Sequence, residues 1–274
     1  MASRLLAFVL VLLAAAPARA GEIEVFAGSA SKPATEEAAR AFEARTGTRV
    51  LLHFGGSGAV LAQMELARRG DVYFPGSSDF MEKAKRKGLV DPATEVRVVY
   101  LLPAINVARG NPKGIRSLED LARPGIRVGM ARPDTVCVGL YGVEILERKG
   151  LAEAVRRNVA NYAESCAKTA QMLALGLVDA VLGWDVFDDW NPEKIETIPY
   201  PPDEVPRIGY IPAAASVFAR DREAALAFLG FLTGPEGREI FRRHGYLTTL
   251  EEARRFARPD TPVGGEFPLP ASWR

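Results

Sequence analysis

The sequence predicts an α/β protein built on mainly parallel sheets and long enough for two lobes. Three units of strand, short turn and helix follow one another near the start of the chain, at 23–42, 49–69 and 71–87. Successive units of this kind favour a parallel sheet with helices on its faces. About 254 residues remain once the first twenty are set aside, and the sequence is 48% hydrophobic. That is enough for two lobes, each with its own core.

The first twenty residues have the pattern of a cleavable secretory signal peptide. Arg4 precedes the apolar run Leu5 to Ala16, and the small-residue site Ala18-Arg19-Ala20 follows. The run is too short to span a bilayer comfortably, although a retained anchor is the alternative. We therefore expect a mature chain that begins near Gly21 and is exported, most simply into a bacterial periplasm.

The turns after the three early strands all carry serine. Ser29 follows the alternating strand 23–27, Ser57 follows the strand 49–54, and Ser77-Ser78 follows the strand 71–74. The carboxyl ends of parallel strands meet at one edge of a sheet, where ligands bind in open α/β folds. Each turn also leads into a helix, whose N-terminus offers backbone N–H groups and favours an anion. The pattern predicts an anion site at this edge.

Strands and helices continue to alternate in the second half of the chain. The stretch 96–106 is apolar, contains Pro103, and is interpreted as a connection that leaves the first lobe. Strands are predicted at 126–130, 159–162, 178–183 and 195–200, with helices at 140–149 and 167–175. The proline-rich segment 199–212 is expected to return the chain to the first lobe. A strand at 213–219, helices at 222–233 and 235–244, and a loose tail follow.

Several motifs together resemble the periplasmic molybdate- and tungstate-binding proteins of ABC importers. These are Val25-Phe26-Ala27-Gly28-Ser29-Ala30-Ser31-Lys32-Pro33, Phe54-Gly55-Gly56-Ser57-Gly58-Ala59-Val60, Gly70-Asp71-Val72-Tyr73 and Gly234-Pro235-Glu236-Gly237. They occur in the order and spacing typical of that family, and the resemblance covers nearly the whole mature chain.

The resemblance implies a two-lobe periplasmic binding protein fold, in which two crossover strands join the lobes. We expect a signal peptide at 1–20, the first lobe at 21–103 and 212–274, and the second lobe at 104–211. The implied function is capture of a small inorganic oxyanion such as molybdate or tungstate between the lobes. The implied partner is the permease of an ABC importer, and a monomer without a cofactor is expected.

The resemblance also implies ligand-binding residues. Ser29 and Ser57 correspond to hydroxyl donors of the first lobe, and Val138 to a backbone donor of the second. Cys166 stands where another backbone donor lies. Trp184 stands in place of a tyrosine that usually contributes a hydroxyl, and its indole N–H can donate but not accept.

The two cysteines, Cys137 and Cys166, leave three interpretations open. In an exported protein, a pair of cysteines predicts a disulfide. Alternatively, both thiols face the ligand and bind a soft metal or a metalloid such as copper(I) or arsenite, helped by helix N-termini that lower a thiol pKa. In the third interpretation they are unpaired packing residues. A metal site is not the first expectation.

Composition and motifs argue against other classes of function. Removal of Met1 to Ala20 takes away Arg4 and Arg19 and no acidic residue, so the net charge falls from +1 to −1. No basic excess remains to bind nucleic acid. His53 and His244 are the only histidines, and no nucleophile elbow, zinc signature or Walker loop is present. We expect a binding protein, with an enzyme on a similar two-lobe fold as the alternative.

Overall fold

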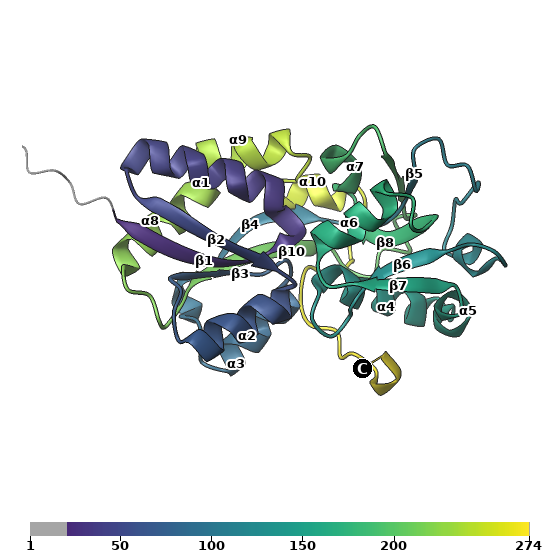
Figure 1. Ribbon diagram of the computed structural model, residues 1–274, viewed down its shortest axis with the longest axis horizontal. Coiled ribbons are helices and arrows are strands. Elements are labelled where there is room, and N and C mark those ends of the chain that lie inside the picture. Colours follow the sequence, from purple (N-terminus) through teal and green to yellow (C-terminus); the bar gives the residue numbers. More distant parts are fainter. Residues whose placement is uncertain (1–20, 274) are drawn as a thin grey trace, which may run out of the picture.

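The computed structural model describes residues 21–273, and these form two five-stranded sheets flanked by helices (Figure 1). The strand order is β2-β1-β3-β10-β4 in the first sheet and β7-β6-β8-β5-β9 in the second. The predicted α/β fold with two lobes is confirmed. The signal peptide expected at 1–20 lies outside the described residues. Within 21–273, no helix has the length and apolar character needed to cross a membrane.

The first lobe is assembled from both ends of the described chain. Its strands are β1 (Glu22–Gly28), β2 (Arg49–Gly55), β3 (Val72–Phe74), β4 (Val96–Leu101) and β10 (Gly209–Ala215). Its helices are α1 (Lys32–Thr46), α2 (Ser57–Ala67), α3 (Ser78–Arg86), α8 (Arg222–Thr233) and α9 (Pro235–Arg243). The strands β1, β2 and β3 are parallel, as the repeated units predict, whereas β10 runs antiparallel between β3 and β4.

The second lobe has the same layered plan. Its strands are β5 (Pro103–Ala108), β6 (Val128–Ala131), β7 (Val159–Ala163), β8 (Ala180–Trp184) and β9 (Ile195–Pro199). Its helices are α4 (Cys137–Arg148), α5 (Ala152–Arg156), α6 (Cys166–Ala174) and α7 (Phe187–Trp190). Parallel pairing joins β6 to β7 and β8, and antiparallel pairing joins β5 to β8 and β9. Short 3₁₀ segments lie at η1 (Ser29–Ser31), η2 (Pro92–Thr94) and η3 (Glu119–Ala122).

Two crossings carry the chain from the first sheet to the second and back. The stretch 96–106, predicted as one connection, is two strands, because β4 ends at Leu101 and β5 begins at Pro103. Leu102 between them donates its N–H to Asp185 Oδ1 at 3.1 Å, and its carbonyl accepts from Asp185 N at 2.9 Å. The second crossing lies between β9 and β10, within the predicted proline-rich segment.

The end of the chain differs from the prediction that 212–274 belongs to the first lobe. The helices α8 and α9 do, but α10 (Leu250–Arg254) and η4 (Ala271–Trp273) contribute Ala253 and Trp273 to the core of the second lobe. Trp273 donates its indole N–H to Glu147 Oε1 at 2.7 Å, and the Arg156 guanidinium lies 5.1 Å from its ring centre. Burial of a large aromatic side chain stabilises a tail whose sequence gives no strand or helix signal.

Candidate ligand site between the lobes

The carboxyl edges of the two sheets face each other, and helix starts from both lobes meet there (Figure 1). The first lobe contributes η1 and the start of α2, and the second contributes the starts of α4 and α6. Two backbone N–H groups donate across the lobe interface at this point. Gly58 N donates to the Thr135 carbonyl at 2.8 Å, and Ala167 N donates to Ser29 Oγ at 3.1 Å.

Both predicted serines are buried at this interface. Ser29 is 3% exposed and Ser57 is 1% exposed. The Ser57 hydroxyl oxygen accepts from Gly76 N at 2.9 Å, while the Ser57 carbonyl accepts from the Tyr73 hydroxyl at 2.9 Å. Hydroxyl oxygens buried among backbone donors give a polar, uncharged surface of the kind that surrounds an anion.

The two cysteines lie against this surface. Both are buried, and their sulfur atoms are 3.4 Å apart, a sulfur–sulfur contact longer than the disulfide bond of about 2.05 Å. The Ser57 hydroxyl and the Val138 N–H hydrogen-bond the Cys137 sulfur. In the structure the pair is therefore two free thiols, and the predicted disulfide stays a prediction.

The electrostatic environment of Cys137 differs from the one expected at a helix start. Burial is the largest influence, followed by the neighbouring Cys166, and together they raise the pKa of the Cys137 thiol well above its ordinary value. The hydrogen bonds from Ser57 and Val138 lower the pKa, but by less. The expectation that the helix N-terminus lowers the pKa of this thiol is wrong, because loss of hydration outweighs the helix dipole.

Trp184 lies behind the serines and thiols and is linked to them through Tyr141. It is fully buried and packs edge-to-face on Tyr141, with ring centres 4.8 Å apart. Tyr141 lies one turn after Cys137 in α4. The Trp184 indole N–H has no hydrogen-bond partner among the described atoms. The structure thus brings together Ser29, Ser57, Cys137, Val138 and Cys166, and a ligand contact for Trp184 stays a prediction.

Two glycines that sequence reasoning missed shape the site. A Cβ placed on Gly76 would lie 2.5 Å from Cys137 Sγ and 2.7 Å from Ala30 Cβ. A Cβ placed on Gly56 would lie 2.7 Å from the Glu164 carbonyl oxygen of the other lobe. Each glycine directly precedes a serine of a predicted turn, and this position was the sequence signal that could have identified it as a site residue. Their absence of a side chain lets the two lobes approach closely.

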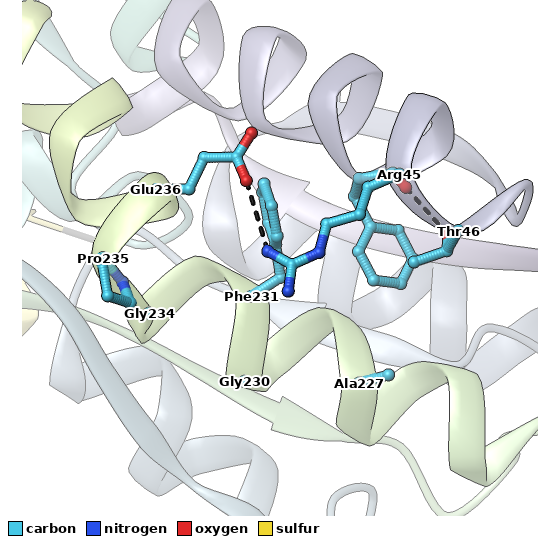
Figure 2. Close-up of a pocket in the computed structure, with 9 residues that line it drawn as sticks. Arg45, Thr46, Ala227, Gly230, Phe231, Gly234, Pro235 and Glu236 are labelled. Atoms are coloured by element: carbon cyan, nitrogen blue, oxygen red, sulfur yellow. Dashed lines mark hydrogen bonds and ion pairs between the residues drawn. The ribbon is translucent and has the colours of Figure 1, made fainter.

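Of two surface pockets, one lies away from the site and the other adjoins it. The one in Figure 2, about 350 Å³, lies between α1, α8 and the start of α9, where Arg45 pairs with Glu236 at 3.3 Å. It contains no predicted site residue. A groove of about 500 Å³ runs between α1 and α6 and is lined by Lys32, Ala167 and Lys194, among others. Because Ala167 N also binds Ser29, this groove adjoins the site.

The acidic residue beside Trp184 faces the crossover instead of the serines. Asp185 Oδ1 accepts from Leu102 N at 3.1 Å. Burial, only partly offset by this hydrogen bond, raises the pKa of Asp185 from its ordinary 3.8 to about 7. Folding therefore favours the protonated carboxyl, and the stability that this provides below pH 4 is lost as the pH rises through 7.

Replacement of Asp185 by asparagine should remove this pH dependence. A shift of three pKa units corresponds to about 4 kcal/mol, but the side chain keeps some contact with solvent. We expect Asp185→Asn to increase the free energy of unfolding by about 1–2 kcal/mol at pH 8 and by much less at pH 5. Urea unfolding at both pH values measures this, with the exposed Asp203→Asn as control. An equal effect at both pH values would show that Asp185 does not titrate in this range.

Comparisons with known proteins agree with the architecture. A family model described as a bacterial extracellular solute-binding protein matches residues 23–247. A putative binding protein of Haemophilus influenzae is 25% identical over 252 residues, which cover 89% of this chain and 98% of that protein. The molybdate-binding protein ModA of Rhodobacter capsulatus is 28% identical, covering 88% and 94%. The solved structure of the sulfate-binding protein SubI of Mycobacterium tuberculosis has a TM-score of 0.75 at 18% identity, covering 89% and 94%.

Proposed function

Because the chain belongs to the bacterial extracellular solute-binding proteins, we propose that it captures a small inorganic oxyanion for an ABC importer in the periplasm. The proposed ligand is of the molybdate or tungstate kind, bound between the lobes without a cofactor. The protein acts by binding and release and not by catalysis. Relatives named for molybdate and for sulfate are consistent with an oxyanion as the ligand. Which oxyanion binds then depends on the residues that line the site.

One observation carries the proposal: helix starts from both lobes meet around two buried serine hydroxyls. Backbone N–H groups at these starts are the donors that an anion needs, and the helix dipoles favour negative charge. Gly76 N and Ala167 N donate to the two serine oxygens, and each hydroxyl can rotate to donate in turn. Arg207 is the one buried cation among residues 21–273, and it pairs with Asp79 and Glu144. The proposed anion is therefore held by neutral donors.

The mechanism follows from the two crossings of the chain. Opening at the crossings would separate Gly58 from Thr135 and Ser29 from Ala167, and closure would restore both hydrogen bonds around the ligand. Closure excludes water and so strengthens each interaction with the anion. The permease would then recognise the closed form. Lys32 and Lys194 in the adjoining groove would attract anions toward the site before closure.

Alanine at either serine should weaken oxyanion binding. A hydrogen bond to a charged group contributes about 1.5–3 kcal/mol, so we expect Ser29→Ala and Ser57→Ala each to raise the Kd by about tenfold to hundredfold. Isothermal titration calorimetry with molybdate, tungstate and sulfate measures the change and ranks the ligands. Ser216→Ala is the matched control, because Ser216 is also buried but its hydroxyl accepts from Phe218 N, at the opposite edge of the first sheet. Unchanged affinity in both site variants would refute the site.

A further inference from the structure

A pair of thiols lies at the same lobe interface. Binding of an oxyanion through its oxygen atoms does not require these thiols. Cys137 and Cys166 are both buried, are held as free thiols, and have their sulfurs 3.4 Å apart. We infer that this pair is a dithiol site for thiophilic trivalent oxyacids, with arsenous acid, the neutral form of arsenite, as the type ligand. The inference rests on the proposed function in placing the ligand between the lobes, and it adds a class of ligand bound through its central atom.

The distance between the sulfurs fits a pyramidal central atom more closely than a tetrahedral or a linear one. For bonds of about 2.3 Å to each sulfur, an angle of about 95°, normal for an atom with a lone pair, separates the sulfurs by about 3.4 Å. A tetrahedral ion would need about 3.8 Å, and a linear two-coordinate ion about 4.6 Å. The observed 3.4 Å matches the pyramidal case without movement of either sulfur. Trivalent arsenic has this geometry.

The number of available ligands points the same way. No group of three or more histidine, cysteine, aspartate or glutamate side chains that could hold a metal ion occurs in the part of the chain that the structure describes. A structural zinc ion takes four protein ligands and a catalytic one takes three. A trivalent oxyacid needs only two thiols, because it keeps one of its own oxygen atoms as the third ligand.

The chemistry balances without an oxidant or a reductant. Two As–S bonds form and two As–O bonds break, and the two thiol protons leave with the two hydroxides as water. Arsenic stays trivalent, and one As–OH group remains. The reactants and the product are all neutral, which suits a buried site where the pKa of Cys137 is raised and a thiolate is disfavoured.

The surroundings provide partners for the remaining As–OH group. The Ser57 hydroxyl and the Val138 N–H already hydrogen-bond the Cys137 sulfur. Gly76 closes the site from the first lobe, since a Cβ at this position would lie 2.5 Å from Cys137 Sγ. The ligand would therefore enter when the lobes separate, and the backbone at Gly76 would cover it on closure.

The test uses the mature chain, reduced with a phosphine because a dithiol reductant would compete for arsenite. Native mass spectrometry of the wild type should show an adduct equal to arsenous acid less two waters, and calorimetry should show one site. Cys137→Ser and Cys166→Ser should each raise the Kd for arsenite by about a hundredfold or more, because the second bond is intramolecular. Ser216→Ala is the control, and wild type oxidised to the disulfide should not bind.

The outcomes separate this inference from the proposed function. If the wild type binds molybdate or tungstate but forms no arsenite adduct, the inference is wrong and the oxyanion site stands. If it forms the adduct but binds no oxyanion, the proposed function fails instead. Arsenite binding that survives in both cysteine variants would overturn the dithiol site. So would binding of Zn²⁺ or copper(I) by a wild type that ignores arsenite. Because the adduct is measured on the wild type, this part of the test does not depend on whether a cysteine variant folds.

Discussion

Alanine at Gly56 is expected to hold the two lobes apart and to weaken oxyanion binding by about tenfold to hundredfold. Its Cβ would lie 2.7 Å from the Glu164 carbonyl oxygen, 2.9 Å from the Thr135 carbonyl oxygen and 2.9 Å from Val136 Cγ2. All three atoms belong to the second lobe, and two are backbone atoms that cannot rotate away. Overpacking of this kind costs about 1–3 kcal/mol, or about fivefold to somewhat over a hundredfold in Kd, a range that includes the stated loss of affinity.

The first lobe itself tolerates this substitution. The Gly56 backbone has φ −65° and ψ 142°, an extended conformation that alanine adopts without strain. The clash therefore acts on closure and not on folding of either lobe. We expect the ligand-free variant to keep the wild-type melting temperature while small-angle scattering reports a larger radius of gyration. Calorimetry with molybdate measures the affinity.

A matched glycine makes the comparison specific. Gly230 lies in α8, and a Cβ built on it meets no atom within 4 Å. Gly230→Ala should leave affinity unchanged and raise stability by up to about 1 kcal/mol, since alanine favours a helix. Wild-type affinity in Gly56→Ala would show that binding does not require the close approach of the lobes at this point.

Local patterns were sufficient to predict most of the architecture. The alternation in 23–27 and the small turn after it predict β1 and the start of the following helix, and the same reasoning gives β2 and α2. Because parallel strands share a carboxyl edge, the serine turns could be placed at one edge of a sheet. The resemblance to oxyanion-binding proteins then predicted that the second lobe forms the opposite side of the ligand site.

Contacts between distant segments could not be predicted. The approach of Gly76 to Cys137 joins residues from different lobes, and no local pattern encodes it. The direction of the Cys137 pKa shift depends on burial, which a helix-start motif does not report. Trp273 packs on the second lobe through a tertiary contact with Glu147. Each of these features depends on desolvation or on packing between segments that are distant in the sequence. Both effects arise only when the lobes are assembled.

The second large effect is expected at Arg207, which lies in the second crossing and is 3% exposed. Its Nη2 donates to Asp79 Oδ1 in the first lobe at 2.9 Å, and its Nε donates to Glu144 Oε2 in the second at 2.7 Å. It also donates to the Gly265 carbonyl at 2.8 Å and lies 4.0 Å from the Tyr141 ring centre. One guanidinium thus connects both lobes and the C-terminal segment.

Arg207→Met should lower the free energy of unfolding by about 3–5 kcal/mol, because buried Asp79 loses its cation and buried Glu144 keeps only the exposed Arg148. Urea unfolding at pH 7 measures the loss. Neutralising the carboxylates in the same chain, with Asp79→Asn and Glu144→Gln, should recover much of it, since no unpaired buried charge would remain. Loss of packing alone would predict no such recovery.

Arg148 provides the control on the same glutamate. It pairs with Glu144 Oε1 at 2.8 Å, but its side chain is 53% exposed. Solvent screens such a pair, so Arg148→Met should cost less than about 1 kcal/mol. If Arg207→Met and Arg148→Met destabilise the protein equally, burial does not set the strength of these ion pairs. A large difference between them would instead show that the buried guanidinium, which contacts both lobes from the crossing, contributes far more to stability than the exposed one.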